Sequence, residues 1–296
     1  MTSNSESLPG IYDPSKKGLE TLARCLKSGE EVPLLTAFPL AAVDGLAQVA
    51  QYFPEILKNE NEELLERASS LGLPRNASPL IRAMAGWLDR EQPRLVLLSS
   101  HHQGAEIRAM LSVFEPRTKV LVLDLEPSRP KDVVSLLAQL RAALGQGVLR
   151  EDSRSILEEL EGPRSGTALG VGLLGLAGFS KDLRDLLKER GTPITIDEYE
   201  LGQRIGLGGT VADWCSWEDR DRRFEILTSG KVSGLIMFTE AFSPESLIAR
   251  RFRRAELAPV LTLEMESLWG LSASMRLRLE AFLDMLGARP FSEGVG

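Results

Sequence analysis

Two adjacent histidines, His101 and His102, are the only histidines in the chain. They lie in the polar segment 99–104, directly after an apolar run, and imidazole titrates near neutral pH, so either ring could transfer a proton or bind a metal. Neighbours on an extended segment point in opposite directions, so we expect at most one of them to face a ligand. Gln103 is a candidate substrate-binding residue beside them. The alternative is a polar loop that caps the next helix.

A second candidate loop, residues 239–245, follows another apolar run. Glu240 is a candidate general base there, although a solvated carboxylate fits the pattern equally well. Ser243 and Glu245 favour a structural interpretation: a serine N-cap, then Pro244 in the first turn, then an acid that complements the helix dipole. A catalytic role for Ser243 and a substrate-binding role for Glu245 are the less favoured alternatives.

The strongest basic cluster comprises Arg250, Arg251, Arg253 and Arg254. Arg250 and Arg254 are candidates for binding the phosphates of a ligand. Charge runs on helices are usually solvated, and that interpretation leads here. Residues 170–175 match GxGxxG, but these glycines fall inside an apolar run and not in a strand-to-helix turn, so a nucleotide site is disfavoured.

The composition excludes several classes of protein. The net charge of −7 and the sequence pI of about 5.2 argue against nucleic-acid binding, which needs a concentrated cationic face. Cys25 and Cys215 are the only cysteines, too few for a disulfide framework or a CxxC metal knuckle, so we predict no metal site and a reducing, cytoplasmic compartment. No signal peptide is recognisable, and the longest apolar run is too short and glycine-rich to cross a bilayer.

The apolar pattern predicts an α/β protein with two doubly wound, mainly parallel-sheet lobes and a helical N-terminal region. Short runs such as residues 94–100, 119–124, 233–239 and 259–264 suit strands buried on both faces, and amphipathic stretches between them suit helices. We expect helices at 179–190, with Ser180 as N-cap, at 219–228, at 246–257 and at 272–286, while residues 38–92 look mainly helical. The expected divisions are an extension at 1–30, a first lobe at 31–150 and a second at 151–296.

The C-terminal half carries four motifs in order: GLIMF at 234–238, AFSPE at 241–245, PVLTLE at 259–264 and RLEAFLDML at 278–286. With these motifs the chain resembles the cluster-binding subunits of 2-hydroxyacyl-CoA dehydratases and benzoyl-CoA reductases. Weaker matches cover SPLIR at 78–82, where that family has a Cys-Pro-x-Val-Arg segment, and the loop at 99–108. Together the resemblance spans roughly residues 75 to 288.

Members of that family hold a [4Fe–4S] cluster with three cysteines. The resemblance puts those positions here at Ser78, at Gly104 (or His102, if the loop is shifted) and at Ser243. A serine hydroxyl replaces a thiolate poorly as an iron ligand, so we expect no cluster and predict no other cofactor.

The resemblance then implies a cluster-free subunit or accessory protein that binds an acyl-CoA or pairs with a cluster-bearing homologue or a second copy. From the charge and the apolar pattern we expect neither nucleic acid nor a membrane as a partner. The alternative is a self-sufficient enzyme that uses His101 or His102 together with Glu240 in acid–base or metal-assisted chemistry. A purely structural interaction protein is a third hypothesis.

Overall fold

A computed structural model describes residues 16–35, 38–40, 43–57, 62–93, 95–99, 107, 109–111, 119–123, 138–139, 141–142, 145–146, 170–204, 207–208, 232–240, 258–265 and 268–288. The chain divides into two compact units. Unit 1 comprises residues 1–162 and 199–220, and unit 2 comprises residues 163–198 and 221–296. Within the described part, no helix combines the length and the apolar character needed to cross a membrane.

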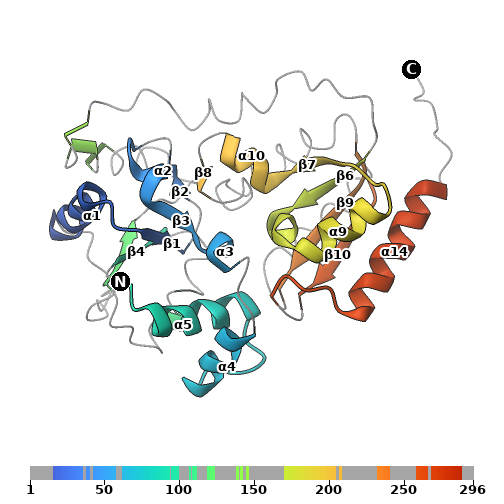
Figure 1. Ribbon diagram of the computed structural model, residues 1–296, viewed down its shortest axis with the longest axis horizontal. Helices are drawn as coiled ribbons and strands as arrows, with labels where there is room; N and C mark the ends of the chain where they lie inside the picture. Colours follow the sequence, from blue (N-terminus) through green and yellow to red (C-terminus); the bar gives the residue numbers. More distant parts are fainter. Residues whose placement is uncertain are drawn as a thin grey trace, which may run out of the picture. The chain divides into compact units, whose positions relative to one another are not determined.

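Unit 1 contains a four-stranded parallel sheet in the order β3-β1-β4-β5 (Figure 1). A separate antiparallel pair joins β2 to β8. The strands are β1 (Val32–Leu34), β2 (Phe38–Pro39), β3 (Ala50–Tyr52), β4 (Leu95–Ser99), β5 (Lys119–Leu123) and β8 (Leu207–Gly208). The helices are α1 (Lys16–Ser28), α2 (Leu46–Val49), α3 (Phe53–Ile56), α4 (Glu63–Ser70), α5 (Pro79–Glu91) and α10 (Glu198–Arg204), of which Glu198 belongs to unit 2.

Helix α5 has a serine cap at its N-terminus. The side chain of Ser78 accepts a hydrogen bond from the N–H of Ile81 (3.2 Å), and proline occupies the first turn. Helix α5 packs against α4 at Gly86, where an added Cβ would lie 2.2 Å from the carbonyl oxygen of Leu64. The two backbones can approach this closely only because residue 86 has no side chain.

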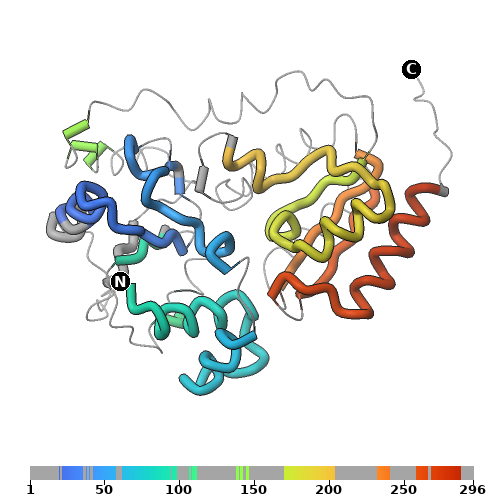
Figure 2. The backbone as a smooth tube through the Cα atoms, viewed as in Figure 1, coloured from blue at the N-terminus to red at the C-terminus, as the bar shows by residue number. Residues whose placement is uncertain are grey.

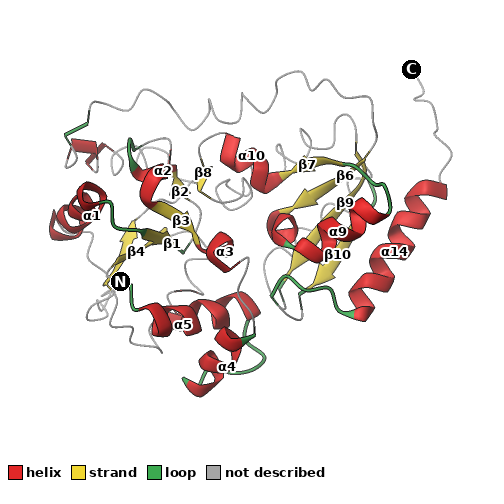
Figure 3. Cartoon of the chain, in the orientation of Figure 1, coloured by secondary structure: helices red, strands yellow, loops and turns green. Residues whose placement is uncertain are grey.

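Unit 2 contains a second four-stranded parallel sheet, in the order β10-β9-β6-β7 (Figure 3). Its strands are β6 (Gly170–Leu174), β7 (Ile194–Asp197), β9 (Val232–Thr239) and β10 (Val260–Glu264). The 3-10 helix η3 (Gly175–Phe179) and helix α9 (Lys181–Glu189) connect β6 to β7, and α14 (Ala273–Ala288) follows β10 (Figure 2). The sequence-predicted N-cap of α9 is confirmed, because Ser180 accepts a hydrogen bond from the N–H of Leu183 (3.2 Å).

The central strand β9 is buried on both faces. Gly234 faces α14, since a Cβ there would lie 2.8 Å from atoms of Phe282 and Leu286. Ile236 shares that face and Leu235 the opposite one, by the two-residue period of a strand, and both are 0% exposed. Both faces of the sheet are therefore covered at this strand.

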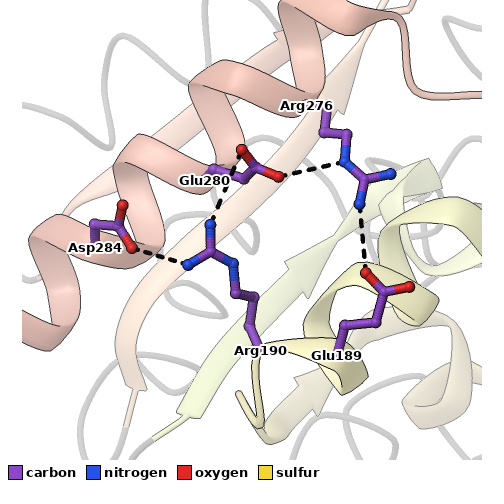
Figure 4. A network of polar contacts seen from close by, with 5 residues as sticks. All are labelled: Glu189, Arg190, Arg276, Glu280 and Asp284. Carbon is purple, nitrogen blue, oxygen red and sulfur yellow. Dashed lines mark hydrogen bonds and ion pairs between the residues drawn. The ribbon is translucent and has the colours of Figure 1, made fainter.

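An ion-pair network joins the end of α9 to α14 (Figure 4). Arg190 lies 3.2 Å from Asp284 and 3.9 Å from Glu280, and Arg276 lies 3.3 Å from Glu280 and from Glu189. All of these side chains are partly exposed, so each pair contributes at most about 1 kcal/mol. The network therefore contributes only modestly to holding the end of α9 near α14.

The predicted α/β architecture with parallel sheets is confirmed, and the strands expected at 94–100, 119–124, 233–239 and 259–264 are present. Residues 38–92 are less helical than expected, because β2 and β3 form there. Strand β3 has only three residues, and its pairing with β1 rather than a local apolar pattern stabilises it. The helices predicted at 219–228 and 246–257 lie outside the described residues.

Candidate active site at the carboxyl ends of the strands

Both parallel sheets have the same strand order. If the strands of each sheet are numbered 1 to 4 in chain order, both sheets have the spatial order 2-1-3-4. The corresponding labels are β3-β1-β4-β5 in unit 1 and β7-β6-β9-β10 in unit 2. In each sheet the order reverses between the first and third strands, β1 and β4 in unit 1 and β6 and β9 in unit 2. Open parallel sheets bind ligands beyond the carboxyl ends of the strands at such a reversal. The topology therefore gives each unit one candidate site.

In unit 2 this position is formed by Gly175, after β6, and by Thr239 and Glu240, at the end of β9. We call these residues, together with Glu198, the β6/β9 edge. Gly175 has φ +56° and opens the turn into η3. Its N–H donates a hydrogen bond of 2.7 Å to Oε2 of Glu198, a side chain that is only 1% exposed. The Glu198 carboxylate thus fixes the backbone at the end of β6, the first strand of this sheet.

A second buried carboxylate, Asp197, holds the rest of the η3 turn. Asp197 is 5% exposed and forms an ion pair with Arg184, whose Nε donates to the carbonyl oxygen of Gly178 (2.8 Å). A Cβ on Gly178 would lie 2.7 Å from Oδ1 of Asp197, so a larger residue there would push the carboxylate away. Because one arginine binds both the carboxylate and the turn, the η3 backbone is fixed relative to β7.

The third strand brings a polar pair to the same edge. Thr239 is buried, and its carbonyl oxygen accepts a hydrogen bond from the N–H of Met265 (2.8 Å). Glu240 follows it and is half-buried. Of the three predicted catalytic residues, Glu240 alone lies among the described residues, and it occupies the end of the third strand as the sequence indicated. A half-buried carboxylate at this position has the chemistry of a general acid or base.

Most of the other predicted site residues fall outside the described part of the chain. Strand β4 ends at Ser99, so the histidine loop leaves the third strand of its sheet, the counterpart of β9 in unit 2. The residues of both loops and of the basic cluster that lie outside are His101, His102, Gln103, Gly104, Ser243, Glu245, Arg250 and Arg254.

Ser78 is described, and its hydroxyl is the N-cap of α5. The glycines of the GxGxxG match pack strands together: a Cβ on Gly170 would lie 2.2 Å from the carbonyl oxygen of Pro193, and one on Gly172 would lie 2.6 Å from Leu235. Close strand packing therefore explains these two glycines without a nucleotide.

Sequence reasoning missed Glu198, Asp197 and Arg184 as members of this region. The available signal was the adjacent pair of acids, Asp197 and Glu198, at the carboxyl end of β7. Within the described residues, no group of three or more His, Cys, Asp or Glu side chains has the arrangement of a metal site. A scan of protein-family models found no match to the chain, and a search of curated proteins found none either.

Proposed function

We propose that the chain is a 2-hydroxyacyl-CoA dehydratase/benzoyl-CoA reductase-like protein without the [4Fe–4S] ligands. It acts as an acyl-CoA-binding or accessory subunit that pairs with a cluster-bearing homologue or a second copy. It works in the cytoplasm, and its two units are two doubly wound lobes. The burial of β9 on both faces and the identical order of the two sheets support this architecture.

The observation that carries the proposal is the role of Ser78. The resemblance puts the first cluster cysteine at this position, and here the hydroxyl caps α5 while the carbonyl oxygen accepts the N–H of Arg82 (2.9 Å). Both the hydroxyl and the carbonyl oxygen of Ser78 thus accept hydrogen bonds from the first turn of α5, which is a structural role. The position therefore has a reason to be serine that does not involve iron.

The packing of the C-terminal motifs also supports the resemblance. The motifs GLIMF, PVLTLE and RLEAFLDML correspond to β9, β10 and α14, and β9 and β10 pair in parallel along five residues. Gly234 lies against Phe282 and Leu286, so the glycine of the first motif and the apolar residues of the last depend on each other. Such packing residues do not take part in the chemistry of a site, so we expect them to persist when the site residues change.

The proposal is tested by restoring the thiolates. The triple variant Ser78→Cys, Gly104→Cys, Ser243→Cys should acquire a brown [4Fe–4S] cluster on anaerobic reconstitution, while the unmodified protein should stay free of iron and sulfide. A second triple variant with His102→Cys in place of Gly104→Cys decides the register of the loop, and Ser78→Cys alone is the control. Failure of both triple variants to bind iron, despite normal folding, would contradict the resemblance.

The proposed role as an acyl-CoA-binding or accessory subunit needs a separate measurement. Affinity purification from the host should recover a homologous partner, or calorimetry should detect binding of an acyl-CoA. Absence of both would refute the subunit role, whatever the cluster experiment gives.

One observation favours the alternative enzyme. Glu240 follows the third strand of the unit 2 sheet, the histidine loop follows the third strand of the unit 1 sheet, and each of these strands lies at the reversal of order in its own sheet. In that case the double variant His101→Ala, His102→Ala and the variant Glu240→Gln should each abolish turnover of whatever substrate is found. Full activity in the double histidine variant would exclude this mechanism.

A further inference from the structure

Helix α14 carries an exposed apolar stripe. Within the described residues, the large hydrophobic side chains that are exposed are Leu277 (68%) and Met285 (38%), and both belong to this helix. Ala281 is also exposed and lies midway between them. Residues four apart lie on one side of a helix, so these three side chains form one continuous row, which we call the α14 stripe. The stripe is separate from the buried side chains of the same helix, which are Met275, Leu279, Phe282 and Leu283.

Two residues of opposite charge flank the stripe. Arg278 lies three residues before Ala281 and Asp284 three residues after it, so the helical turn of about 100° per residue puts them on opposite sides of the stripe. Asp284 pairs with Arg190 but is still 68% exposed. Arg278 is exposed and donates to the carbonyl oxygen of Thr262 (2.9 Å), a bond that uses one of its five N–H groups. Both charges are therefore accessible to a partner.

The stripe and its flanks are complementary to themselves in the antiparallel direction. If two α14 helices pack about a two-fold axis at Ala281, residues equally distant from this position on opposite sides meet. Leu277 of one copy then contacts Met285 of the other, and Arg278 contacts Asp284, each of them twice. Ala281 meets its own copy, and its small side chain lets the two helices approach closely. In a parallel pair Arg278 and Asp284 would lie about 9 Å apart along the axis and would not meet.

We propose that the α14 stripe is a docking surface for a second copy of this chain, through antiparallel packing of two α14 helices. The charge pattern selects this occupant, because a two-fold contact requires one patch that complements itself. A single pair of helices makes a small interface, so we expect a weak dimer whose formation depends on concentration. The inference specifies one of the partners in the proposed function and rests on it for the biological role of the dimer, whereas the contact itself rests on α14 alone.

The arrangement is tested first by cross-linking the full chain. Ala281→Cys puts a thiol on the two-fold axis, where a short bis-maleimide reagent should link it to its own copy. Gly287→Cys is the matched control, because this position is exposed on the same helix but lies outside the stripe, and the native cysteines are the same in both variants. No linked dimer with Ala281→Cys, or equal linking in the two variants, would overturn the inference.

Sedimentation velocity over a range of concentrations measures the apolar contribution. The unmodified chain should show a monomer–dimer equilibrium, and Leu277→Gln should weaken it about tenfold or more, because a leucine that is buried only in the dimer is lost twice. Lys188→Gln, an exposed change on α9, is the control and should leave the equilibrium unchanged. A chain that is monomeric at every concentration would overturn the inference, as would equal effects of the two variants.

Reversing the charges gives a readout that a structural role within one chain would not move. Arg278→Glu and Asp284→Arg should each weaken the dimer about tenfold, and the double variant should recover most of the loss, since the two opposite charges again meet across the axis. Asp284→Arg also removes a pair with Arg190, a loss that the double variant shares, so the difference between these two variants reports the contact with position 278. A double variant no better than Asp284→Arg would overturn the antiparallel arrangement.

The outcome is distinguishable from that of the proposed function. A monomeric chain that binds an acyl-CoA or a homologous subunit overturns this inference and leaves the proposed function standing. A dimer with the expected cross-link and charge rescue, but without binding of an acyl-CoA or a homologue, supports this inference and refutes the subunit role.

Discussion

The carboxylate of Glu198 and the backbone N–H of Gly175, which lie 23 residues apart in the chain, are joined by a partly buried hydrogen bond of 2.7 Å. The bond connects the residue that follows β7 to the end of β6, one of the two strands on either side of the reversal of strand order. It therefore fixes the backbone on which a ligand site of unit 2 would be built.

Replacing Glu198 with alanine should destabilise the protein by about 1–3 kcal/mol, because the N–H of Gly175 is then left without its buried acceptor. Glu198→Gln keeps a side-chain oxygen and should lose less. Urea unfolding of the two variants measures the difference. Equal stability of Glu198→Ala and the unmodified protein would show that water or another group replaces the carboxylate.

Gly234→Ala should cost about 1–3 kcal/mol, since the new Cβ would lie 2.8 Å from atoms of Phe282 and Leu286. Gly287→Ala, in α14, is the matched control. A Cβ at position 287 meets nothing within 4 Å, and alanine should stabilise the helix by about 0.5–1 kcal/mol. Thermal unfolding should shift in opposite directions for these two variants, and a shift in the same direction would refute the packing argument.

Ser78→Ala should lower stability by about 1 kcal/mol through loss of the N-cap, whereas Ser78→Gly should cost only a few tenths. Chemical unfolding of the pair distinguishes a capping role from a contact of the hydroxyl elsewhere. An equal loss in both variants would argue against capping.

Arg190→Ala should reduce stability by less than about 1 kcal/mol, and the loss should shrink as salt is added, because its partners Glu280 and Asp284 are partly exposed. Lys188→Ala, an exposed change on the same helix, serves as the control. A loss of several kcal/mol that salt does not reduce would mean that the network is the main attachment of α9 to α14.

The sequence predicts elements well where local signals mark both ends. Ser180 and Gly191 bracket α9, and the apolar runs of β9 and β10 need no partner to be recognised. Strand β3 lacks such a signal, because its three residues become a strand only through pairing with β1.

The candidate site is harder to predict, because strand order depends on long-range pairing. The sequence indicates which loops follow strands, and Glu240 is found at the end of β9 as expected. It does not indicate which loops lie at the reversal of order. Glu198 was missed because an acid after a strand is normally solvated, whereas here its carboxylate is buried and accepts the N–H of Gly175, 23 residues away.

The division of the chain has a practical consequence. The polypeptide passes between the two units at residues 162/163, 198/199 and 220/221, and β8, which pairs with β2, comes from the stretch between the last two crossings. No single cut can therefore release either unit whole. A fragment that stops at residue 162 lacks the strand that β2 needs, and one that starts at residue 163 carries a segment whose partners have been removed. Each half has to be studied within the intact polypeptide, or rejoined by a designed linker across the gap left by residues 199–220.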